Sequence, residues 1–273
     1  IMPCYNDGRY IEMAINSVRK QTYSNWELII IDDGSDEQET LDIIEGIQDE
    51  RICVLHTNHF RPAGARNYGI EHANGKYILP VDSDDTIDET YMEKAVNIIE
   101  SDEKIGVVYC EADLFGEKTG KWDLPSYSFE KMLLDNVVFV TALFYKEDWE
   151  KAGGFNTHML AGMEDYDFWL SILALGKDIY QIPEILFHYR IKPISRTTGF
   201  QSDYLQMQET YRQIYDNHKE FYQNNSELYA RVLRDALIEQ IAIRMKYEKV
   251  FAKIEKYYRM PIVGRVLKKM FVH

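Results

Sequence analysis

The sequence predicts an α/β fold with a mostly parallel central sheet, helices on both faces of that sheet, and a helical extension at the carboxyl end. Two observations support this fold class. In the first half of the chain, short apolar runs alternate with segments whose apolar residues recur at helical spacing, which is typical of strands separated by helices. Beyond residue 199 the pattern changes, and residues 202–256 contain neither Gly nor Pro, as expected of successive helices.

The predicted strands are apolar runs, at residues 26–31, 51–55, 76–81 and 105–110. The first of them, WELIII, is rich in β-branched residues, as expected of a strand that is buried on both faces. Helices are predicted between and after these strands, at residues 11–18, 41–47, 91–99 and 165–175. Strands joined by helices of this length pair in parallel, so their carboxyl ends should meet at one edge of the sheet.

We expect two parts in the 273-residue chain, a domain at residues 1–199 and a helical extension at residues 200–273 that ends in a basic tail. The formal charge of the whole chain is −14, from 45 acidic and 31 basic residues. An acidic body of this kind repels nucleic acid, so we expect no nucleic-acid partner. The tail differs, because from Lys253 onward six basic residues stand against one acidic residue.

The cysteines indicate a reducing compartment. Cys4, Cys53 and Cys110 lie in apolar segments and lack the CxxC spacing of metal or redox sites, which predicts reduced, buried thiols. No apolar run approaches the ~20 residues that cross a bilayer. We therefore expect a cytoplasmic protein.

The segment DSDD at residues 82–85 follows one predicted strand and precedes a predicted helix. Three carboxylates within four residues repel one another unless a cation lies between them. Mg²⁺ and Mn²⁺ are hard cations that bind one or two carboxylates together with the phosphates of a substrate. The alternative is helix capping, in which an Asp accepts hydrogen bonds from free backbone N–H groups, although a cap needs one Asp rather than three.

Asp32 and Asp33 follow the strand at residues 26–31, and Gly34 allows the backbone to turn tightly. A carboxylate at this place can accept a hydrogen bond from a nucleobase, and the alternative is a plain Asx turn. Ligands of parallel sheets bind beyond the carboxyl ends of the strands. We therefore expect the segments at residues 3–6, 32–35 and 82–85 to meet at that edge.

An ordered set of short segments resembles family 2 glycosyltransferases. The set consists of PCYN at 3–6, SV at 17–18, QTY at 21–23, ELIIIDDGS at 27–35, GARNYGI at 64–70, GKYI at 75–78, DSDD at 82–85 and EDYDFW at 164–169. These segments follow the order of that family and together cover about residues 1–195. The resemblance implies the nucleotide-diphospho-sugar transferase fold of the GT-A type, a Rossmann-like αβα sandwich, as a catalytic domain at residues 1–199.

The resemblance also implies a nucleotide site at the matching residues. Tyr5 is expected to stack on the nucleobase, with the backbone of Pro3 nearby. Asp33 is expected to hydrogen-bond the base, with Asp32 in support. Arg66 is expected near the base or the diphosphate, and its alternative is an ordinary surface ion pair.

For the acidic segment, the resemblance implies that Asp84 contacts the ribose and that Asp85 binds a Mn²⁺ or Mg²⁺ ion. It further implies that Asp165 is the catalytic base, because the attacking acceptor hydroxyl must lose a proton. Attack from the face opposite the leaving diphosphate implies inversion at the sugar carbon. The alternative for Asp165 is a structural one, since acidic residues at the start of a helix complement the helix dipole.

The segment around His188 departs from the family. Some relatives carry a His two residues after an aromatic-Arg pair, and this chain has Lys192 at that place. His188 is therefore a candidate metal or diphosphate ligand, with a packed structural His as the alternative. Lys192, Arg190 or Arg196 can instead compensate the diphosphate charge.

These expectations describe an inverting, metal-dependent glycosyltransferase, of the hexosyl or N-acetylhexosaminyl type, that acts on a glycan or lipid-linked acceptor. A UDP-sugar is the favoured donor, because Tyr5 and Asp33 suit a uracil or thymine imide. The alternative is a non-catalytic module that binds nucleotide-sugars. A processive synthase is disfavoured by the lack of a QxxRW motif, and a sugar-nucleotide pyrophosphorylase by the lack of a Gly-rich basic loop at residues 3–9.

The basic tail allows two interpretations. Apolar residues at 262–271 alternate with Arg265, Lys268 and Lys269, and an amphipathic helix of this kind can lie on anionic lipid at the inner face of the membrane. Such a peripheral contact would suit a lipid-linked acceptor. The alternative is a helix packed on its own domain with a solvated basic face.

Overall fold

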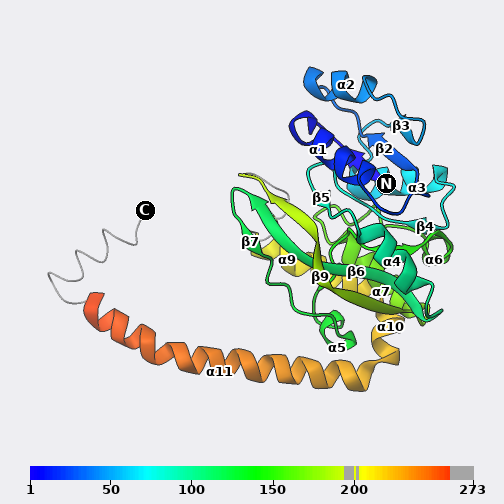
Figure 1. The fold of residues 1–273 in the computed structure, drawn as a ribbon. Helices are drawn as coiled ribbons and strands as arrows, with labels where there is room; N and C mark the ends of the chain where they lie inside the picture. Colours follow the sequence, from blue (N-terminus) through cyan, green and yellow to red (C-terminus); the bar gives the residue numbers. More distant parts are fainter. Residues whose placement is uncertain (194–199, 201–202, 259–273) are drawn as a thin grey trace. The chain divides into compact units, whose positions relative to one another are not determined.

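The computed structural model describes residues 1–193, residue 200 and residues 203–258, without the side chains of residues 249, 251 and 253–258. The chain divides into two compact units, Ile1–Asn224 and Asn225–His273. The first unit is an α/β domain (Figure 1). The predicted basic tail, at residues 259–273, lies outside the described residues.

The first half of the α/β domain contains β1 (Met2–Cys4), α1 (Gly8–Arg19), β2 (Leu28–Asp32), α2 (Gln38–Glu45), β3 (Ile52–His56), α3 (Arg61–His72), β4 (Tyr77–Ile78), β5 (Thr86–Ile87) and α4 (Tyr91–Ile99). Its second half contains β6 (Ile105–Gly116), β7 (Gly120–Lys121), α5 (Phe129–Met132), β8 (Leu143–Tyr145), α6 (Lys146–Ala152), α7 (Glu164–Ala174), β9 (Asp178–Ile191), α9 (Tyr204–Asn217) and α10 (Lys219–Asn224). The α/β fold class is confirmed, and the four predicted helices are found as α1, α2, α4 and α7.

The strands form two sheets that adjoin at β1. The first sheet is parallel, in the order β1-β2-β3. The second sheet, in the order β4-β8-β6-β9-β5, is mixed, because only β6 and β9 pair in parallel. The N–H of Val81 donates to the carbonyl of Ile1 at 2.9 Å, and the amino group of Ile1 donates to Leu79 at 3.0 Å. These hydrogen bonds place the chain after β4 beside β1.

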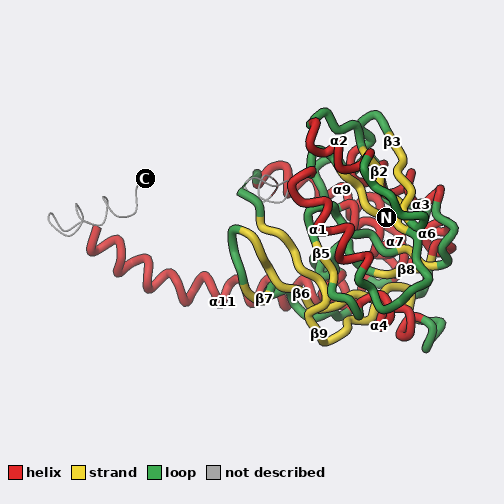
Figure 2. Tube along the Cα trace, turned by 45° about the horizontal axis from the view of Figure 1, so that its top comes forward, coloured by secondary structure: helices red, strands yellow, loops and turns green. Residues whose placement is uncertain are grey.

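Helices cover both sides of the first sheet. In Figures 1 and 2, α1 and α3 lie on opposite sides of β2. Gly69 lets α3 approach the sheet closely, since a β-carbon at this position would lie 2.5 Å from the side chain of Ile31 and 2.9 Å from that of Ile1. This close contact fixes the height of α3 above the strands.

The core of the second sheet is aromatic and is built around α7. Phe168 and Trp169 of α7 are fully buried and pack with Phe144 of β8 and with Phe155. The hydrophobic effect of burying such large rings is about 1.5–3 kcal/mol for each side chain. The helix that carries Asp165 at its start is thereby anchored in a fully buried aromatic core.

The structure corrects two expectations about the strands. The thiol of Cys53 is exposed, not buried, because β3 is the edge strand of that sheet and is only partly covered. The predicted strand at residues 76–81 is confined to β4, and the rest of that segment is irregular. The structure also adds α3, which the sequence analysis did not predict.

The domain includes α9 and α10, so the first unit extends beyond the predicted boundary at residue 199. The hydroxyl of Tyr211 in α9 donates a hydrogen bond to Asp135, and the ring of Phe221 in α10 lies 5.8 Å from that of Phe129. The second unit contains α11 (Ser226–Tyr258). None of the helices within the described part of the chain is long and apolar enough to cross a membrane.

Candidate active site

The loops that follow β1 and β2 are tied together at the carboxyl edge of the first sheet. The side chain of Asn6 donates to the carboxylate of Asp36 at 2.7 Å and accepts from its N–H at 2.9 Å. The N–H of Asn6 donates to the hydroxyl of Ser35 at 3.0 Å. The hydroxyl of Ser83, in the acidic segment, donates to Asp7 at 2.8 Å. The structure therefore brings the segments at residues 3–6, 32–35 and 82–85 to one edge.

Asp33 is buried and holds the loop that leads into α3. Its carboxylate accepts hydrogen bonds from the hydroxyl of Thr57 and the N–H of Phe60, both at 2.6 Å, and from the N–H of Arg61 at 2.8 Å. An ionised carboxylate has about four acceptor positions, so one remains for a ligand. The predicted contact between Asp33 and a nucleobase stays a prediction.

Asp32 lies at the end of β2, beside the predicted backbone contact at Pro3. Its carboxylate accepts from the N–H of Ser35 at 3.0 Å and lies 3.0 Å from Nδ1 of His56 on β3. Pro3 pairs with Ile31 in β1, which keeps its backbone at the same edge. Asp32 thus shapes the turn from which Asp33 projects.

Tyr5 stands at the mouth of this edge. Its side chain is 46% exposed, and its ring centroid lies 4.6 Å from that of His59. Asn6, His59 and Arg61 all have positive φ angles, of 56°, 60° and 65°. Positive φ is uncommon for residues other than glycine and concentrates at functional sites. Three such residues around an exposed aromatic ring are consistent with the predicted stacking platform.

Arg66 of α3 is buried and joins two carboxylates from distant parts of the chain. One guanidinium nitrogen donates to Asp82 at 2.7 Å and another donates to Glu164 at 2.9 Å. The exposed fraction of its side chain is 4%, which excludes the alternative of a surface ion pair. We call this group, Asp82–Arg66–Glu164, the buried ion triad after its buried pair Arg66 and Glu164, since Asp82 is 32% exposed. It connects the acidic segment to the first residue of α7.

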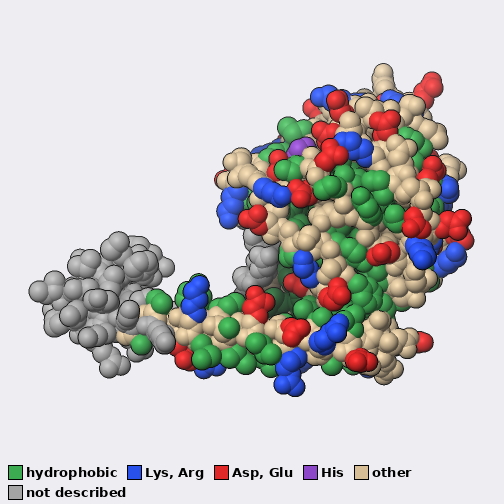
Figure 3. Space-filling model, turned by 60° about the horizontal axis from the view of Figure 1, so that its bottom comes forward, with side chains coloured by type: hydrophobic (Ala, Val, Ile, Leu, Met, Phe, Trp, Pro, Cys, Tyr) green, Lys and Arg blue, Asp and Glu red, His purple; other side chains and the backbone are tan. Residues whose placement is uncertain are grey.

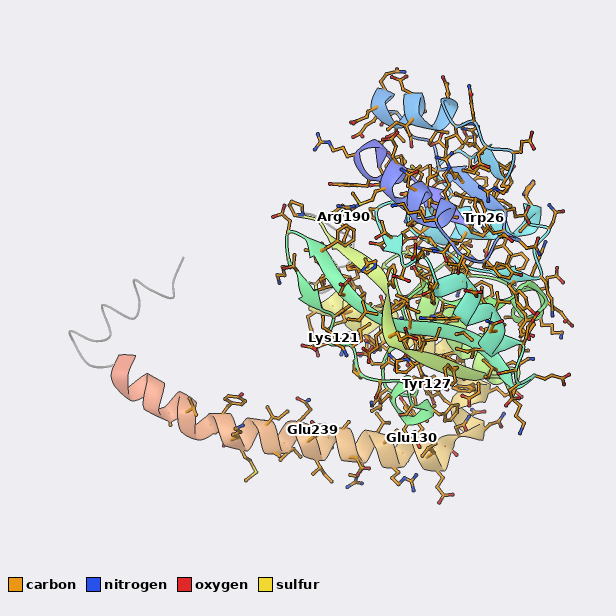
Figure 4. All side chains as sticks on the ribbon, viewed as in Figure 1. Trp26, Lys121, Tyr127, Glu130, Arg190 and Glu239 are labelled. Atoms are coloured by element: carbon orange, nitrogen blue, oxygen red, sulfur yellow. The ribbon has the colours of Figure 1, made fainter. Side chains whose placement is uncertain are left out.

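The other two aspartates of the acidic segment contact the end of β9. Asp84 forms an ion pair with Lys192 at 2.6 Å, and Lys192 also lies 3.2 Å from Asp7. Asp85 is buried and accepts from the N–H of Arg190 at 2.7 Å. The guanidinium of Arg190 donates to the carbonyl of Asp84 at 2.7 Å, and in Figure 4 its side chain is labelled at the end of β9 near α1.

The acidic segment is electrostatically strained. Burial and the neighbouring aspartates raise the pKa of Asp84, and the same two causes raise the pKa of Asp85 well above its ordinary value. Burial alone would lower the pKa of Lys192, but the carboxylates of Asp84 and Asp7 raise it overall. The segment therefore contacts two internal cations, Arg66 and Lys192, and each of them is shared with a further carboxylate, so negative charge remains in excess.

The residues of the acidic segment fit a divalent cation that also has ligands from a bound substrate. Within the described residues, no group of three or more His, Cys, Asp or Glu side chains is arranged to hold a metal ion. Asp84 and Asp85 nevertheless supply two adjacent carboxylates, and Mg²⁺ commonly uses one or two carboxylates together with substrate phosphates. The donor set suits a metal that is shared with a bound diphosphate rather than one held by the protein alone.

His188 points to a partner outside the acidic segment. Its Nδ1 lies 2.6 Å from the carboxylate of Asp113 on β6, and both side chains are about one-third exposed. His188 is paired across the sheet with Thr86, the residue after Asp85. The predicted metal or diphosphate contact of His188 stays a prediction, with Nε2 as the nitrogen left for such a ligand.

Asp165 and Asp85 line the same cavity, which has a volume of about 490 Å³. Met163, just before α7, has a φ of 65°, so the backbone enters the helix from a left-handed residue. The carboxylate of Asp165 accepts from the N–H of Tyr166 at 2.8 Å, and its side chain is partly exposed. A carboxylate at the rim of a cavity can accept a proton from a bound hydroxyl.

Sequence reasoning missed two members of this site. Asp7 follows the first motif by one residue and contacts both Ser83 and Lys192. Glu164 was noted as part of a motif, but its buried contact with Arg66 was not predicted. The only sequence signal for these contacts was the number of acidic segments expected at one edge of the sheet, because carboxylates gathered there require buried cations as partners.

The fold is the GT-A type that the sequence led us to expect, and it places the acidic segment and the candidate base Asp165 at one cavity. The family model for Glycosyl transferase family 2 matches residues 1–159, which is more than half of the chain. The chain belongs to glycosyltransferase family 2.

Curated relatives agree with this family. The chain is 31% identical to an uncharacterized glycosyltransferase of Rickettsia prowazekii, over 77% of this chain and 68% of the relative. It is 29% identical to the putative teichuronic acid biosynthesis glycosyltransferase TuaG of Bacillus subtilis, over 70% of this chain and 77% of that protein. It is 33% identical to the UDP-Glc:alpha-D-GlcNAc-diphosphoundecaprenol beta-1,3-glucosyltransferase WfgD of Escherichia coli, over 63% of this chain and 68% of that protein.

Solved structures show the same fold. The structure of S. aureus TarS 1-349 in complex with UDP-GlcNAc matches with a TM-score of 0.65 at 21% identity. The match covers 79% of this chain and 64% of the TarS chain, so this chain spans somewhat less than two-thirds of that structure.

Proposed function

We propose that the protein is an inverting, divalent-cation-dependent glycosyltransferase that moves a sugar from a UDP-sugar to a hydroxyl of a glycan or lipid-linked acceptor. The observation that carries this proposal is the shared cavity, which is lined by Asp85 on the donor side and by Asp165. One carboxylate is suited to a shared metal and the other to proton transfer.

In the proposed mechanism, Asp165 accepts the proton of the acceptor hydroxyl as that oxygen attacks the anomeric carbon of the donor. A Mn²⁺ or Mg²⁺ ion held by Asp85 would neutralise charge on the leaving diphosphate. Arg66 fixes the start of α7 to the acidic segment through Glu164 and Asp82. Asp165 is thereby held at a set position relative to the donor site, and attack opposite the leaving group inverts the anomeric carbon.

The relatives support the choice of donor and acceptor. WfgD takes glucose from UDP-Glc to a diphosphoundecaprenol-linked sugar, and a TarS structure contains UDP-GlcNAc. TuaG is assigned to teichuronic acid biosynthesis. We therefore propose a UDP-hexose or UDP-N-acetylhexosamine as donor and polysaccharide or glycolipid assembly as the role.

Hydrolysis and transfer assays with a panel of UDP-sugars test the proposal. We expect turnover of at least one donor with Mn²⁺, and none when the metal is removed with a chelator. The competing function is a non-catalytic nucleotide-sugar-binding module. That reading would be favoured by UDP binding without metal-dependent turnover of any donor.

Replacing Asp85 with Asn should separate stability from metal binding. The variant removes one buried negative charge from a crowded acidic segment, so we expect the ligand-free protein to melt a few degrees higher. Added Mn²⁺ with UDP should raise the Tm of the wild type by mass action and leave the variant nearly unchanged. A thermal-shift assay measures both effects, and an equal Mn²⁺ response in the two proteins would contradict the role of Asp85.

We further propose a cytoplasmic location with peripheral membrane contact through the basic tail. The second unit carries exposed apolar side chains along α11 (Figure 3), among them Leu237, Ile238 and Met245. A chain that ends at Tyr258 keeps this surface and lacks only the basic tail. We expect the full chain to co-sediment with vesicles of anionic lipid and a chain ending at Tyr258 to remain in the supernatant. Equal pelleting of the two proteins would contradict a role for the tail.

A further inference from the structure

The described lining of the cavity beside Asp165 is strongly acidic. Its described lining includes five carboxylates and one guanidinium, a formal charge of −4, from Asp82, Asp85, Asp135, Glu164, Asp165 and Arg66. The guanidinium is already paired with two of these carboxylates. A shared metal and diphosphate at Asp85 would leave the charge of the remaining wall unchanged.

The remaining wall is aromatic. It is formed by Trp122, Phe139, Phe187, Tyr189 and Tyr211. The rings of Trp122 and Tyr189 lie 4.7 Å apart, and Trp122 stacks at 6.1 Å on Phe139, which is buried together with Phe187 behind it. Aromatic rings offer flat apolar faces, and ligand pockets combine such faces with a few polar groups that fix orientation.

Asp135 is the carboxylate of this cavity that no step of the proposed mechanism uses. It is exposed, accepts from the N–H of Asn136 at 2.8 Å and accepts from the hydroxyl of Tyr211 on α9. Burial and the hydrogen bond to Asp135 raise the pKa of Tyr211, so its hydroxyl stays a neutral donor. The hydrogen bond from Tyr211 thus holds the Asp135 carboxylate at the wall of the cavity, beside α9.

We propose that this cavity takes an uncharged sugar ring as the acceptor and that Asp135 selects against anionic acceptors. A sugar ring has an apolar C–H face for the aromatic wall and hydroxyl donors for the carboxylates. A uronate or a polyol phosphate would bring its own negative charge next to the carboxylates of the cavity, and this repulsion is unfavourable in a partly desolvated site. The proposal rests on the proposed transferase function, because it names the acceptor class of that same cavity.

Saturation-transfer NMR of the full chain with UDP and Mn²⁺ tests the proposal. The neutral probes are the methyl glycosides of glucose, galactose and N-acetylglucosamine, and the anionic probes are methyl glucuronide and ribitol 5-phosphate. We expect at least one neutral probe to bind, and the anionic probes to bind about tenfold more weakly or not at all at low salt. The difference should shrink at high salt, because screening weakens repulsion between charges.

Matched variants identify the residue responsible. Asp135→Asn should narrow the difference between neutral and anionic probes, whereas Asp123→Asn should leave it unchanged. Asp123 is an exposed carboxylate next to Trp122 that does not line the cavity. Tyr211→Phe should also keep the discrimination, since it retains the charge on Asp135.

Two results would overturn the proposal: anionic probes that bind the wild type as tightly as neutral ones, or UDP binding with no neutral probe bound. Neither result would affect the proposed donor chemistry, which is tested separately by metal-dependent turnover of UDP-sugars. Loss of discrimination in Asp123→Asn as well as Asp135→Asn would equally contradict a specific role for Asp135.

Discussion

Replacing Asp165 with Asn should reduce sugar transfer by about 10²- to 10⁴-fold, the range expected when a general base is lost. The amide has nearly the same shape as the carboxylate and can still accept the hydrogen bond from the N–H of Tyr166. The start of α7 should therefore keep its structure. Donor binding should also persist, because the proposed mechanism places Asp165 on the acceptor side of the cavity.

Initial-rate kinetics and UDP binding by calorimetry measure these two properties in one preparation. We expect kcat to fall while the Kd for UDP with Mn²⁺ stays at the wild-type value. Asp165→Glu keeps the carboxylate but displaces it by one methylene, so an intermediate rate is expected for this control. Transfer by Asp165→Asn at close to the wild-type rate would show that another group removes the proton.

The sequence predicted the part of the fold that local patterns determine. The strand at residues 26–31 and the helix α1 follow from periodicity, because a buried parallel strand and an amphipathic helix each leave a distinct apolar pattern. The helix α3 leaves no such pattern. It packs through small residues, including Ala65 and Gly69, whose contribution is close approach to the sheet rather than apolar area.

The strand β3 illustrates a second limit. Its sequence resembles that of β2, and only its position at the edge of the first sheet leaves Cys53 exposed. Whether a strand lies at the edge or in the centre depends on how the whole sheet is assembled, so the sequence of one strand does not reveal its position. The mixed second sheet was missed for the same reason, since the direction of pairing depends on distant segments.

For the candidate site, the sequence predicted the types of side chain and their positions at the strand ends better than it predicted their contacts. Carboxylates at the strand ends could be recognised from order and spacing alone. Their partners could not, because Arg66 meets a carboxylate 98 residues away and Lys192 meets Asp7 from a distance of 185 residues. Such ion pairs exist only after folding. The sequence leaves open which cation lies beside which carboxylate.

The buried ion triad should be the most sensitive point for stability. Replacing Arg66 with Met removes the buried guanidinium that contacts Glu164, whose side chain is 3% exposed. Removing one member of a buried ion pair typically costs about 3–5 kcal/mol. We expect a loss of this size in the free energy of unfolding, measured by urea denaturation of the protein without its ligands.

Two comparisons separate the charge effect from loss of packing. The double variant Arg66→Met with Glu164→Gln should recover part of the loss, because the buried carboxylate that lost its guanidinium contact is replaced by a neutral amide. Arg51→Met is the surface control, because the side chain of Arg51 is 46% exposed and pairs with Asp49. Its guanidinium also lies 3.9 Å from the ring centroid of Trp26, which is labelled in Figure 4. An exposed pair of this kind should cost less than about 1 kcal/mol.

The triad also links stability to chemistry. Its guanidinium joins the acidic segment, which is expected to hold the donor's metal, to the helix start that carries Asp165. Arg66→Lys keeps one positive charge but cannot contact both carboxylates with the same planar geometry. We therefore expect Arg66→Lys to recover much of the stability and little of the transfer rate. Recovery of both stability and transfer rate in Arg66→Lys would mean that only the positive charge is required. A loss of stability below about 1 kcal/mol in Arg66→Met would contradict a buried ion pair altogether.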